Sequence, residues 1–419
     1  MRIAHIGPPL ARQGGPAGYL LQLQQAAREA GATDVLFPAA AAVAAPAAAN
    51  APSALASARR ALGRVKRSVF GVPRFGRPAT ADLEREGGPI DTVMADTRRM
   101  LVEDTAASVE LARRSHADVW FCHDSATAAH LLDMPDRRQV WLFQHAPFPL
   151  AFYQTWCWGV PEWDWHDVAR LPDVMRSTNW ETSVWKRVDR FVLPCPEALE
   201  ELVRIDPAAA PLAKTTAYVL TGARVRAEGA PATSRDELRA RWGFGPEPVG
   251  LYLGANQPYR GFDALAAGLE QLTSRDAAGV IAVAGPDPDS LPAHPRLRPL
   301  GRVSDVAGLL DAVDFVVNTN RFSLFDLSTI EAVEAGKPLL MHAVGGNKTF
   351  KTLGAGCVMI DDLAPGTVAR ALRAMFTMPA GDRDALGSAS RACYERHLTL
   401  AHFWRGHSDL YACKTPQTS

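Results

Sequence analysis

Cysteine is scarce in this chain of 419 residues, and its six copies lie far apart. No two of them form a Cys-x-x-Cys pair, which argues against a zinc ribbon, a thioredoxin-type motif and a dense disulfide framework. A protein of the reducing cytoplasm is therefore expected. The six residues are Cys122, Cys157, Cys195, Cys357, Cys393 and Cys413.

Net charge and long apolar runs are also absent. The 45 Lys and Arg residues balance the 45 Asp and Glu residues, so no overall field draws the chain to nucleic acid. The longest uncharged run, residues 35–58, is rich in alanine and is interrupted by Pro38, Pro46 and Pro52, which argues against a membrane-spanning helix. No secretory signal is expected at the N-terminus. With 47% hydrophobic and 21% charged residues, the chain is expected to be mostly folded.

Short apolar runs alternate with helical patterns, as in the βαβ units that build parallel sheets. We therefore expect an α/β protein with two Rossmann-like domains. The N-terminal domain would cover residues 1–225, with a variable Ala-, Pro- and Arg-rich arm at 38–84, and the C-terminal domain 226–395; the segment 396–419 would form a helix that returns to the N-terminal domain. Expected strands are 2–6, 33–37, 118–122, 139–144, 190–193, 249–253, 280–284, 315–318, 338–342 and 357–360, and helical patterns cover 366–375 and 383–412.

Two turns at the ends of expected strands have residues suited to phosphate. Gly14 and Gly15 precede an apolar helix, and a glycine-rich turn at a helix N-terminus presents free backbone N–H groups to an anion. A plain tight turn explains these glycines about equally well, because the spacing is not Gly-x-Gly-x-x-Gly. Arg260 follows the expected strand 249–253, and parallel sheets bind ligands at the carboxyl ends of their strands. Its guanidinium suits a phosphate, although a surface arginine is the simpler interpretation of Arg260 alone.

The most informative stretch is residues 318–338. A strand leads into a polar loop, a helix is predicted to begin near Asp326, and Gly336 ends that helix before the next strand. This stretch resembles the nucleotide-sugar loop of the family 4 retaining glycosyltransferases, which have the GT-B fold. In that family a Glu, seven further residues and a second Glu precede a small-residue run that ends Gly-x-Pro. Glu331 and the small residues after it match the second Glu and its sequel.

The resemblance implies roles for several residues. Glu331 would hold the donor ribose. Ser323 stands where the family has its first Glu, and Asp326 is the nearby carboxylate that would substitute for it at the donor sugar. Arg260 stands where the family has a phosphate-binding Lys, whereas Ala255 replaces its usual Arg. The other implied donor contacts are Gly14, Gly15, Gly254, Asn256, Arg302, Val303, Leu327 and Ser328.

Candidate residues of the N-terminal domain follow two expected strands. His145 matches a histidine of the family 4 glycosyltransferases, and in that family this histidine approaches the donor sugar. His123, followed by Asp124, is a second imidazole at a strand end and a candidate for the acceptor side. A lone histidine is more often structural, but two at successive strand ends make a structural and a functional role about equally plausible.

Tryptophan is concentrated just after His145. Six of the ten tryptophans lie between residues 156 and 185. Indole faces suit sugar stacking, so a platform for the acceptor and a packed aromatic cap are equally good interpretations. The platform candidates are Trp156, Trp158, Trp163 and Trp165.

Other charged residues favour simpler interpretations. The basic segment 59–77 has interleaved apolar residues, which suits either an amphipathic helix on an anionic membrane or a solvated arm. Asp287 and Asp289 imitate a metal-binding pair, but they lie in a turn-rich loop, and the resemblance implies that diphosphate departs without metal. No metal and no cofactor are therefore expected. Glu334 is expected to be a solvated helix residue or an ion-pair partner.

These patterns and the resemblance predict a cytoplasmic glycosyltransferase, and whether the segment 59–77 also contacts the inner membrane face stays open. It would move a sugar from a nucleoside diphosphate, UDP or GDP, to a glycan, lipid-linked or small-molecule acceptor, and the resemblance implies retention of configuration. Because the first Glu and one Arg of the pattern are missing, two alternatives remain. One is a non-catalytic GT-B partner protein that binds nucleotide or glycan, and the other is a nucleotide-sugar epimerase.

Overall fold

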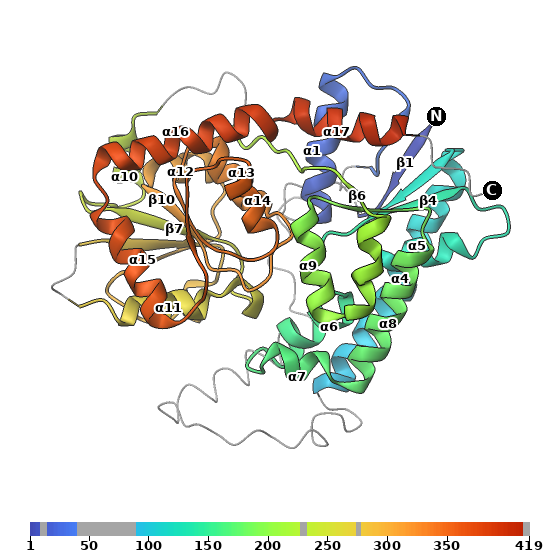
Figure 1. Ribbon diagram of the computed structural model, residues 1–419, viewed down its shortest axis with the longest axis horizontal. Helices are drawn as coiled ribbons and strands as arrows, with labels where there is room; N and C mark the ends of the chain where they lie inside the picture. Colours follow the sequence, from blue (N-terminus) through green and yellow to red (C-terminus); the bar gives the residue numbers. More distant parts are fainter. Residues whose placement is uncertain (9–14, 40–88, 227–232, 274–277, 414–419) are drawn as a thin grey trace.

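The computed structural model describes residues 1–8, 15–39, 89–226, 233–273 and 278–413. Over these ranges the chain forms two domains side by side, each built on a six-stranded sheet with helices on both faces (Figure 1). Every strand pairs with its neighbours in parallel. The predicted α/β fold with two Rossmann-like domains is therefore confirmed. The basic segment 59–77 and nearly all of the predicted arm lie outside the described residues.

The N-terminal sheet has the order β2-β1-β3-β4-β5-β6. The first five strands coincide with the apolar runs, whereas β6, only two residues long, was not predicted. The strands are β1 (Ile3–Ile6), β2 (Val35–Leu36), β3 (Val119–Cys122), β4 (Gln139–Phe143), β5 (Arg190–Leu193) and β6 (Ala217–Tyr218). The helices are α1 (Pro16–Glu29), α4 (Pro89–Ser115), α5 (Ser125–Leu132), α6 (Leu150–Gln154), α7 (Trp165–Ala169), α8 (Pro172–Arg187) and α9 (Pro196–Ile205), with short turns η1 (Thr155–Gly159) and η2 (Pro207–Lys214).

Successive side chains of each buried strand point to opposite faces of the sheet, so the core is divided between two helical layers. In β3, Val119 and Phe121 pack with residues of α1, whereas Trp120 and Cys122 pack with residues of α4 and α5. Both sets are buried, which explains why the strand reads as a continuous apolar run.

The C-terminal sheet has the order β12-β11-β10-β7-β8-β9. The strand β9 was missed, because Arg298 and Pro299 interrupt its apolar pattern. The strands are β7 (Val249–Leu253), β8 (Val280–Ala284), β9 (Leu297–Gly301), β10 (Phe315–Asn318), β11 (Leu339–His342) and β12 (Cys357–Ile360). The helices are α10 (Arg235–Arg241), α11 (Phe262–Glu270), α12 (Val306–Ala312), α13 (Leu327–Glu334), α14 (Gly346–Thr352), α15 (Pro365–Thr377) and α16 (Ala380–His397), with short turns η3 (Pro258–Arg260) and η4 (Pro288–Ser290).

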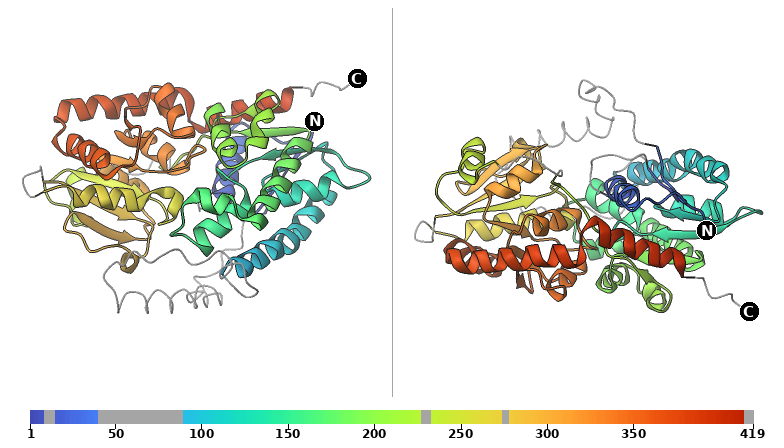
Figure 2. Two further views of the ribbon diagram at one scale, coloured as in Figure 1. Left: turned by 60° about the horizontal axis from the view of Figure 1, so that its bottom comes forward. Right: turned by 90° about the horizontal axis from the view of Figure 1, so that it is seen from above.

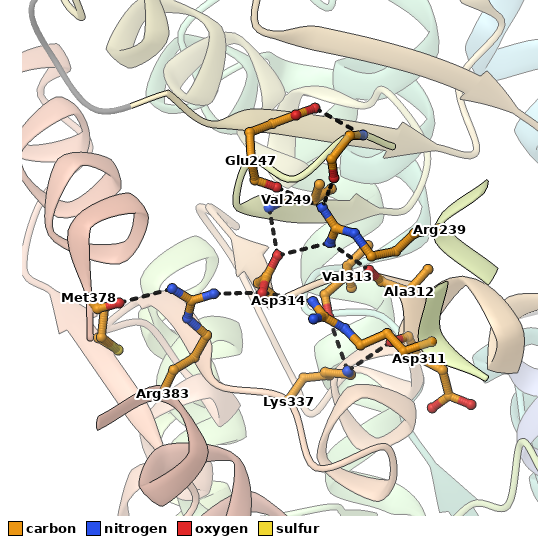
Figure 3. A network of polar contacts seen from close by, with 12 residues as sticks. Arg239, Glu247, Val249, Asp311, Ala312, Val313, Asp314, Lys337, Met378 and Arg383 are labelled. Carbon is orange, nitrogen blue, oxygen red and sulfur yellow. Dashed lines mark hydrogen bonds and ion pairs between the residues drawn. The ribbon is translucent and has the colours of Figure 1, made fainter. Parts of the chain in front are cut away.

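A buried carboxylate ties the amino end of this sheet together (Figure 3). Asp314, just before β10, accepts hydrogen bonds from the Val249 backbone at 2.8 Å and from Arg383 at 2.6 Å, and also pairs with Arg235 and Arg239. Removing one partner from such a buried pair typically costs about 3–5 kcal/mol. Because Asp314 lies at the amino end of β10, this network is opposite the carboxyl end, where ligands bind in such sheets.

The chain crosses between the two domains twice, and the two crossing segments lie side by side. The helix α16 packs on α13 of the C-terminal domain, and α17 (Leu400–Ala412) packs on α1 of the N-terminal domain (Figure 2). The single helix expected over 383–412 is therefore wrong: Leu398 and Thr399 separate two helices, and the Thr399 hydroxyl caps α17 by accepting from the His402 backbone. The other crossing contains Ala223, whose N–H donates to Leu398 O at 3.2 Å and whose carbonyl accepts from Tyr394 at 2.9 Å.

Candidate functional site

Two loops at the carboxyl edge of the C-terminal sheet come into close contact. The turn η3 follows β7 and holds Arg260, and the loop 319–326 follows β10 and leads into α13. Gly261 has a φ of 64°, and a Cβ atom there would lie 1.9 Å from the Thr319 carbonyl oxygen. Only glycine permits this backbone and this approach. The Arg321 N–H donates to Tyr259 O at 2.7 Å and joins the loops again.

A buried pair of asparagines shapes the second loop. Asn318 accepts a hydrogen bond from the Asn320 backbone at 3.1 Å, and the Asn347 side chain donates to Asn318 Oδ1 at 3.3 Å. Sequence reasoning missed Asn347. The available sequence signal was the Gly345-Gly346 pair before it, since glycine permits close backbone contact. In the structure, a Cβ atom on Gly346 would lie 1.8 Å from Leu324 O.

Arg260 and Asp326 face each other between the two loops. Arg260 Nη1 lies 3.2 Å from Asp326 Oδ2, and their side chains are 21% and 16% exposed. Asn320 Nδ2 and Ser323 Oγ also donate to Asp326 Oδ2. Among the described residues, the buried Arg260 Nε has no hydrogen-bond partner. Arg260 also borders a small cavity, which is lined by Tyr252, Leu253, Arg260, Val316, Val317, Asn318, Asn320, Ser328 and Thr329.

Ser328, in the first turn of α13, lines the same small cavity as Arg260. Asp326 is the N-cap residue, but its carboxylate makes no capping hydrogen bond and instead faces Arg260. Within the described part of the chain, no acceptor contacts the backbone N–H groups of Leu327 and Ser328. Such free N–H groups at the positive end of a helix attract phosphate.

Glu331 lies one turn further along α13. No described residue makes a hydrogen bond or an ion pair with its carboxylate. Burial, followed by the nearby charge of Glu334, raises the pKa of Glu331 to about 7. A partly buried carboxyl group without a protein partner is suited to accept hydrogen bonds from ligand hydroxyl groups.

Glu334 is not a solvated residue. It is buried, and its carboxylate accepts a hydrogen bond from the Val225 backbone at 2.6 Å. The solvated interpretation was therefore wrong, because α13 packs next to the segment that crosses between the domains, which the sequence pattern of the helix does not reveal. The nearby Arg391 and Arg226 charges agree with the alternative of a charge partner.

The two candidate histidines of the N-terminal domain are in direct contact. His145 follows β4 and is half-buried, and His123 follows β3 and is buried. Their rings share a hydrogen bond of 2.7 Å between His123 Nδ1 and His145 Nε2. Asp124 has a structural role as the N-cap of α5, where its carboxylate accepts from the Thr127 backbone at 2.7 Å.

The candidate tryptophans differ in exposure. Trp156 is buried, and its indole N–H donates to Trp163 O, so it presents no stacking face to an acceptor. The packed-cap interpretation therefore describes Trp156. Trp158 is 40% exposed, and Trp163 and Trp165 are half-buried.

The remaining predicted donor contacts lie mainly at the carboxyl edges of the sheets. Gly254 follows β7 beside Arg260, and a Cβ atom there would lie 3.9 Å from Arg260 Cδ. Asn256 is exposed in the same loop, and Arg302 and Val303 directly follow β9. Gly15 is the N-cap of α1 with a φ of 75°, whereas Gly14 lies outside the described residues.

Phe322 is a site residue that sequence reasoning missed. It belongs to the loop after β10, yet it is fully buried among rings of the N-terminal domain. Its ring centroid lies 5.6 Å from that of Phe148, 5.7 Å from Trp156 and 5.2 Å from Trp165. The Arg204 guanidinium lies 4.1 Å above the same ring. The available signal was an aromatic residue, Phe322, between the polar residues Arg321 and Ser323.

No group of three or more His, Cys, Asp or Glu side chains in the described ranges is arranged to hold a metal ion. No helix in the described part of the chain is long and apolar enough to cross a membrane.

Comparison with known proteins gives a family match for the C-terminal domain. Residues 247–377 match the family model of glycosyl transferases group 1. A D-inositol 3-phosphate glycosyltransferase from Catenulispora acidiphila is 30% identical over an alignment of 167 residues, and the match covers 35% of this chain and 40% of that protein. The matched segment therefore spans well under half of the relative.

Solved structures show the same architecture over the whole chain. HepE from Anabaena, in complex with UDP and glucose, superposes with a TM-score of 0.62 at 14% identity, covering 99% of this chain and 100% of that one. Sucrose-phosphate synthase from Thermosynechococcus elongatus superposes with a TM-score of 0.60 at 15% identity, covering 98% of both chains. The chain therefore has the predicted GT-B fold, and its residues 247–377 match the group 1 glycosyltransferases.

Proposed function

We propose that the protein is a glycosyltransferase that binds a nucleoside diphosphate sugar at the carboxyl edge of the C-terminal sheet. The observation that carries this proposal is the grouping of a cation and two free backbone N–H groups, with an unpaired carboxyl group one helical turn away. These belong to Arg260, Leu327, Ser328 and Glu331. All four lie inside the segment that matches the glycosyltransferase family. The UDP in the Anabaena structure supports a uridine donor.

Each group has a distinct task in this proposal. Arg260 and the first turn of α13 stabilise the negative charge that develops on the departing diphosphate. Glu331 accepts hydrogen bonds from the ribose hydroxyl groups. His145 approaches the donor sugar from the other domain, and Ser323 and Asp326 contact sugar hydroxyl groups. No residue is assigned as a nucleophile, and transfer proceeds with retention and without metal.

The acceptor binds to the N-terminal domain in this proposal. Three of the candidate tryptophans that follow His145 in the sequence retain exposed surface: Trp158, Trp163 and Trp165. Indole faces stack well on sugar rings. A glycan, lipid-linked or small-molecule acceptor fits this chemistry.

A thermal-shift panel tests the donor site without knowledge of the acceptor. The protein is heated with each nucleoside diphosphate and each corresponding sugar, with and without EDTA. A ligand at 100 times its Kd adds about 2.7 kcal/mol to the folded state. Stabilisation by one diphosphate that persists in EDTA is the expected result. No shift with any of them would reject the donor site.

A second candidate function is a non-catalytic GT-B protein that binds a nucleotide or a glycan. The ion pair between Arg260 and Asp326 favours it, because the cation already has a partner. Hydrolysis and transfer assays with the nucleotide sugar that stabilises the protein distinguish the two functions. Binding without turnover, across a panel of acceptors, would favour the second.

A further inference from the structure

Six aromatic side chains form one continuous chain of hydrogen bonds through the N-terminal domain. His145 Nε2 contacts His123 Nδ1 at 2.7 Å, and His123 Nε2 contacts His5 Nδ1 at 2.8 Å. His5 Nε2 then contacts the hydroxyl group of Tyr411 at 2.9 Å. Two further residues, His407 and Tyr19, continue this series, and we refer to all six side chains together as the histidine relay.

The relay continues through α17, the last helix, which packs on α1 of the N-terminal domain. The Tyr411 hydroxyl contacts His407 Nδ1 at 3.1 Å, and His407 Nε2 contacts the Tyr19 hydroxyl at 2.7 Å. Tyr411 and His407 belong to α17, Tyr19 belongs to α1, and His5 belongs to β1. Residues from distant parts of the sequence thus connect to His145, the candidate histidine that follows β4.

The four imidazoles are neutral at pH 7. Burial lowers the pKa of His145 and of His407 to about 3. Burial also lowers the pKa values of His5 and His123 well below the ordinary value, and the neighbouring histidines lower both further. A neutral imidazole has one N–H donor and one acceptor nitrogen, so each ring in the relay donates on one side and accepts on the other.

The Tyr19 hydroxyl sets the direction of the relay. Tyr19 is 3% exposed, and among the described residues His407 Nε2 is its one hydrogen-bond partner. If His407 donated to Tyr19, the phenol proton would be buried without an acceptor, which costs the full desolvation of that donor. Tyr19 therefore donates, and His407 carries its proton on Nδ1.

The other protons follow from this choice. His407 Nδ1–H donates to the Tyr411 oxygen, so the Tyr411 proton is donated to His5 Nε2. His5 and His123 then each carry their proton on Nδ1 and donate to the next ring. His145 Nε2 accepts the last hydrogen bond, and the remaining proton of His145 is on Nδ1.

We propose that the histidine relay holds His145 as its Nδ1–H tautomer, so that this nitrogen donates a hydrogen bond to an oxygen of the bound donor. Tyr19, His407, Tyr411, His5 and His123 are positioning residues that act through His145. The contact with the donor rests on the proposed function, whereas the tautomer does not.

Nitrogen NMR tests the tautomer directly. Long-range proton–nitrogen correlations are recorded at pH 7 on the full chain labelled with 15N-histidine. The His145 signals are identified by their loss in His145→Gln. The expected spectrum has a protonated Nδ1 and an unprotonated Nε2. A protonated Nε2, an average of both forms or a cationic ring in the wild-type protein would overturn the proposal.

Two isosteric variants test the relay, with a third as the matched control. Tyr19→Phe removes the group that sets the direction, and Tyr411→Phe interrupts the relay, so each is expected to give His145 a mixture of tautomers. Tyr218→Phe removes the hydroxyl group of a tyrosine on β6 that is 38% exposed, and it is expected to leave the spectrum unchanged. An unchanged His145 tautomer in both relay variants would refute the relay, even if one of them folded poorly.

Donor binding separates the two parts of the proposal. The apparent Kd for the nucleotide sugar is expected to rise in proportion to the loss of the Nδ1–H form, about two-fold for equal populations. If the tautomer responds and the nucleotide sugar binds equally well to all variants, the relay stands and the donor contact is rejected. If no nucleotide sugar binds the wild-type protein, the proposed function fails and the NMR result still decides the tautomer.

Discussion

The Arg260 guanidinium lies 3.2 Å from the Asp326 carboxylate, and each comes from a different loop at the carboxyl edge of the C-terminal sheet. Arg260 is also the cation placed to receive a diphosphate in the proposed site. A phosphate at Arg260 must therefore compete with a carboxylate of the protein. The same carboxylate accepts from Asn320 and Ser323, so a change at Arg260 also affects the loop after β10.

Substitutions at these two positions are expected to act in opposite directions. Asp326→Asn removes the competing charge and should strengthen nucleoside diphosphate binding by about 1 kcal/mol, the upper range for a partly exposed ion pair. Arg260→Ala should weaken catalysis by about 2.7–4 kcal/mol, the usual effect of losing one group that stabilises developing charge. Calorimetric titration and turnover assays measure the two effects. Arg298→Ala, an exposed arginine on β9, is the control, and full activity of Arg260→Ala would defeat its assignment to phosphate.

Stability should depend on pH through Glu331. Its pKa is raised from 4.5 to about 7 in the folded state, so the fold favours the neutral form. The contribution of Glu331 to stability is complete below pH 4.5 and is lost as the pH rises through 7. Glu331→Gln does not titrate, so its stability relative to the wild-type protein should increase between pH 5 and pH 8 in chemical denaturation. A difference that is constant with pH would contradict the burial of this carboxyl group.

Donor binding should depend on pH with the opposite sign. Ribose hydroxyl groups donate to the ionised carboxylate, so affinity for a nucleotide sugar should rise as the pH passes through 7. A nucleotide sugar is the suitable probe because it lacks the terminal phosphate that titrates near pH 6. Glu331→Gln should bind more weakly and without this pH dependence. The same pH profile in both proteins would assign the titration to another group.

Phe322 should help to hold the two domains together, because it places the loop after β10 among rings of the N-terminal domain. Phe322→Ala leaves a cavity among Phe148, Trp156 and Trp165 and should cost about 3–5 kcal/mol of stability. Phe376→Ala removes a ring that is buried within the C-terminal domain and should cost a similar amount. Small-angle scattering should show an increased radius of gyration only for Phe322→Ala. Equal radii for both variants would mean that Phe322 does not hold the domains together.

The candidate tryptophans should separate into packing and binding residues. Trp156→Ala should lower stability by about 3–5 kcal/mol, because this ring is 2% exposed. The double variant Trp163→Ala and Trp165→Ala should remain folded and lose acceptor affinity once an acceptor is known. Unchanged acceptor affinity in the folded double variant would reject a stacking role.

The sequence patterns revealed strands more readily than the contacts between distant elements. Five strands of the second half were found because buried parallel strands are almost continuously apolar, whereas β9 was missed because exposed Arg298 and Pro299 interrupt it. Arg260 and Glu331 were predicted as site residues because they lie in local motifs. The burial of Glu334 and the insertion of Phe322 depend on elements far away in the sequence. Local periodicity contains no information about such partners.

The position of α17 also affects how the protein is synthesised. Leu400, Phe403 and Leu410 of this helix belong to the same core as Ile3 and Tyr19. A ribosome therefore releases the last part of the first domain only after the entire second domain has emerged. The C-terminal domain is able to complete its core first. Until α17 emerges, the N-terminal domain has an exposed apolar face on β1, β3 and α1. Nascent chains stalled before residue 400 should therefore require chaperones that recognise this face.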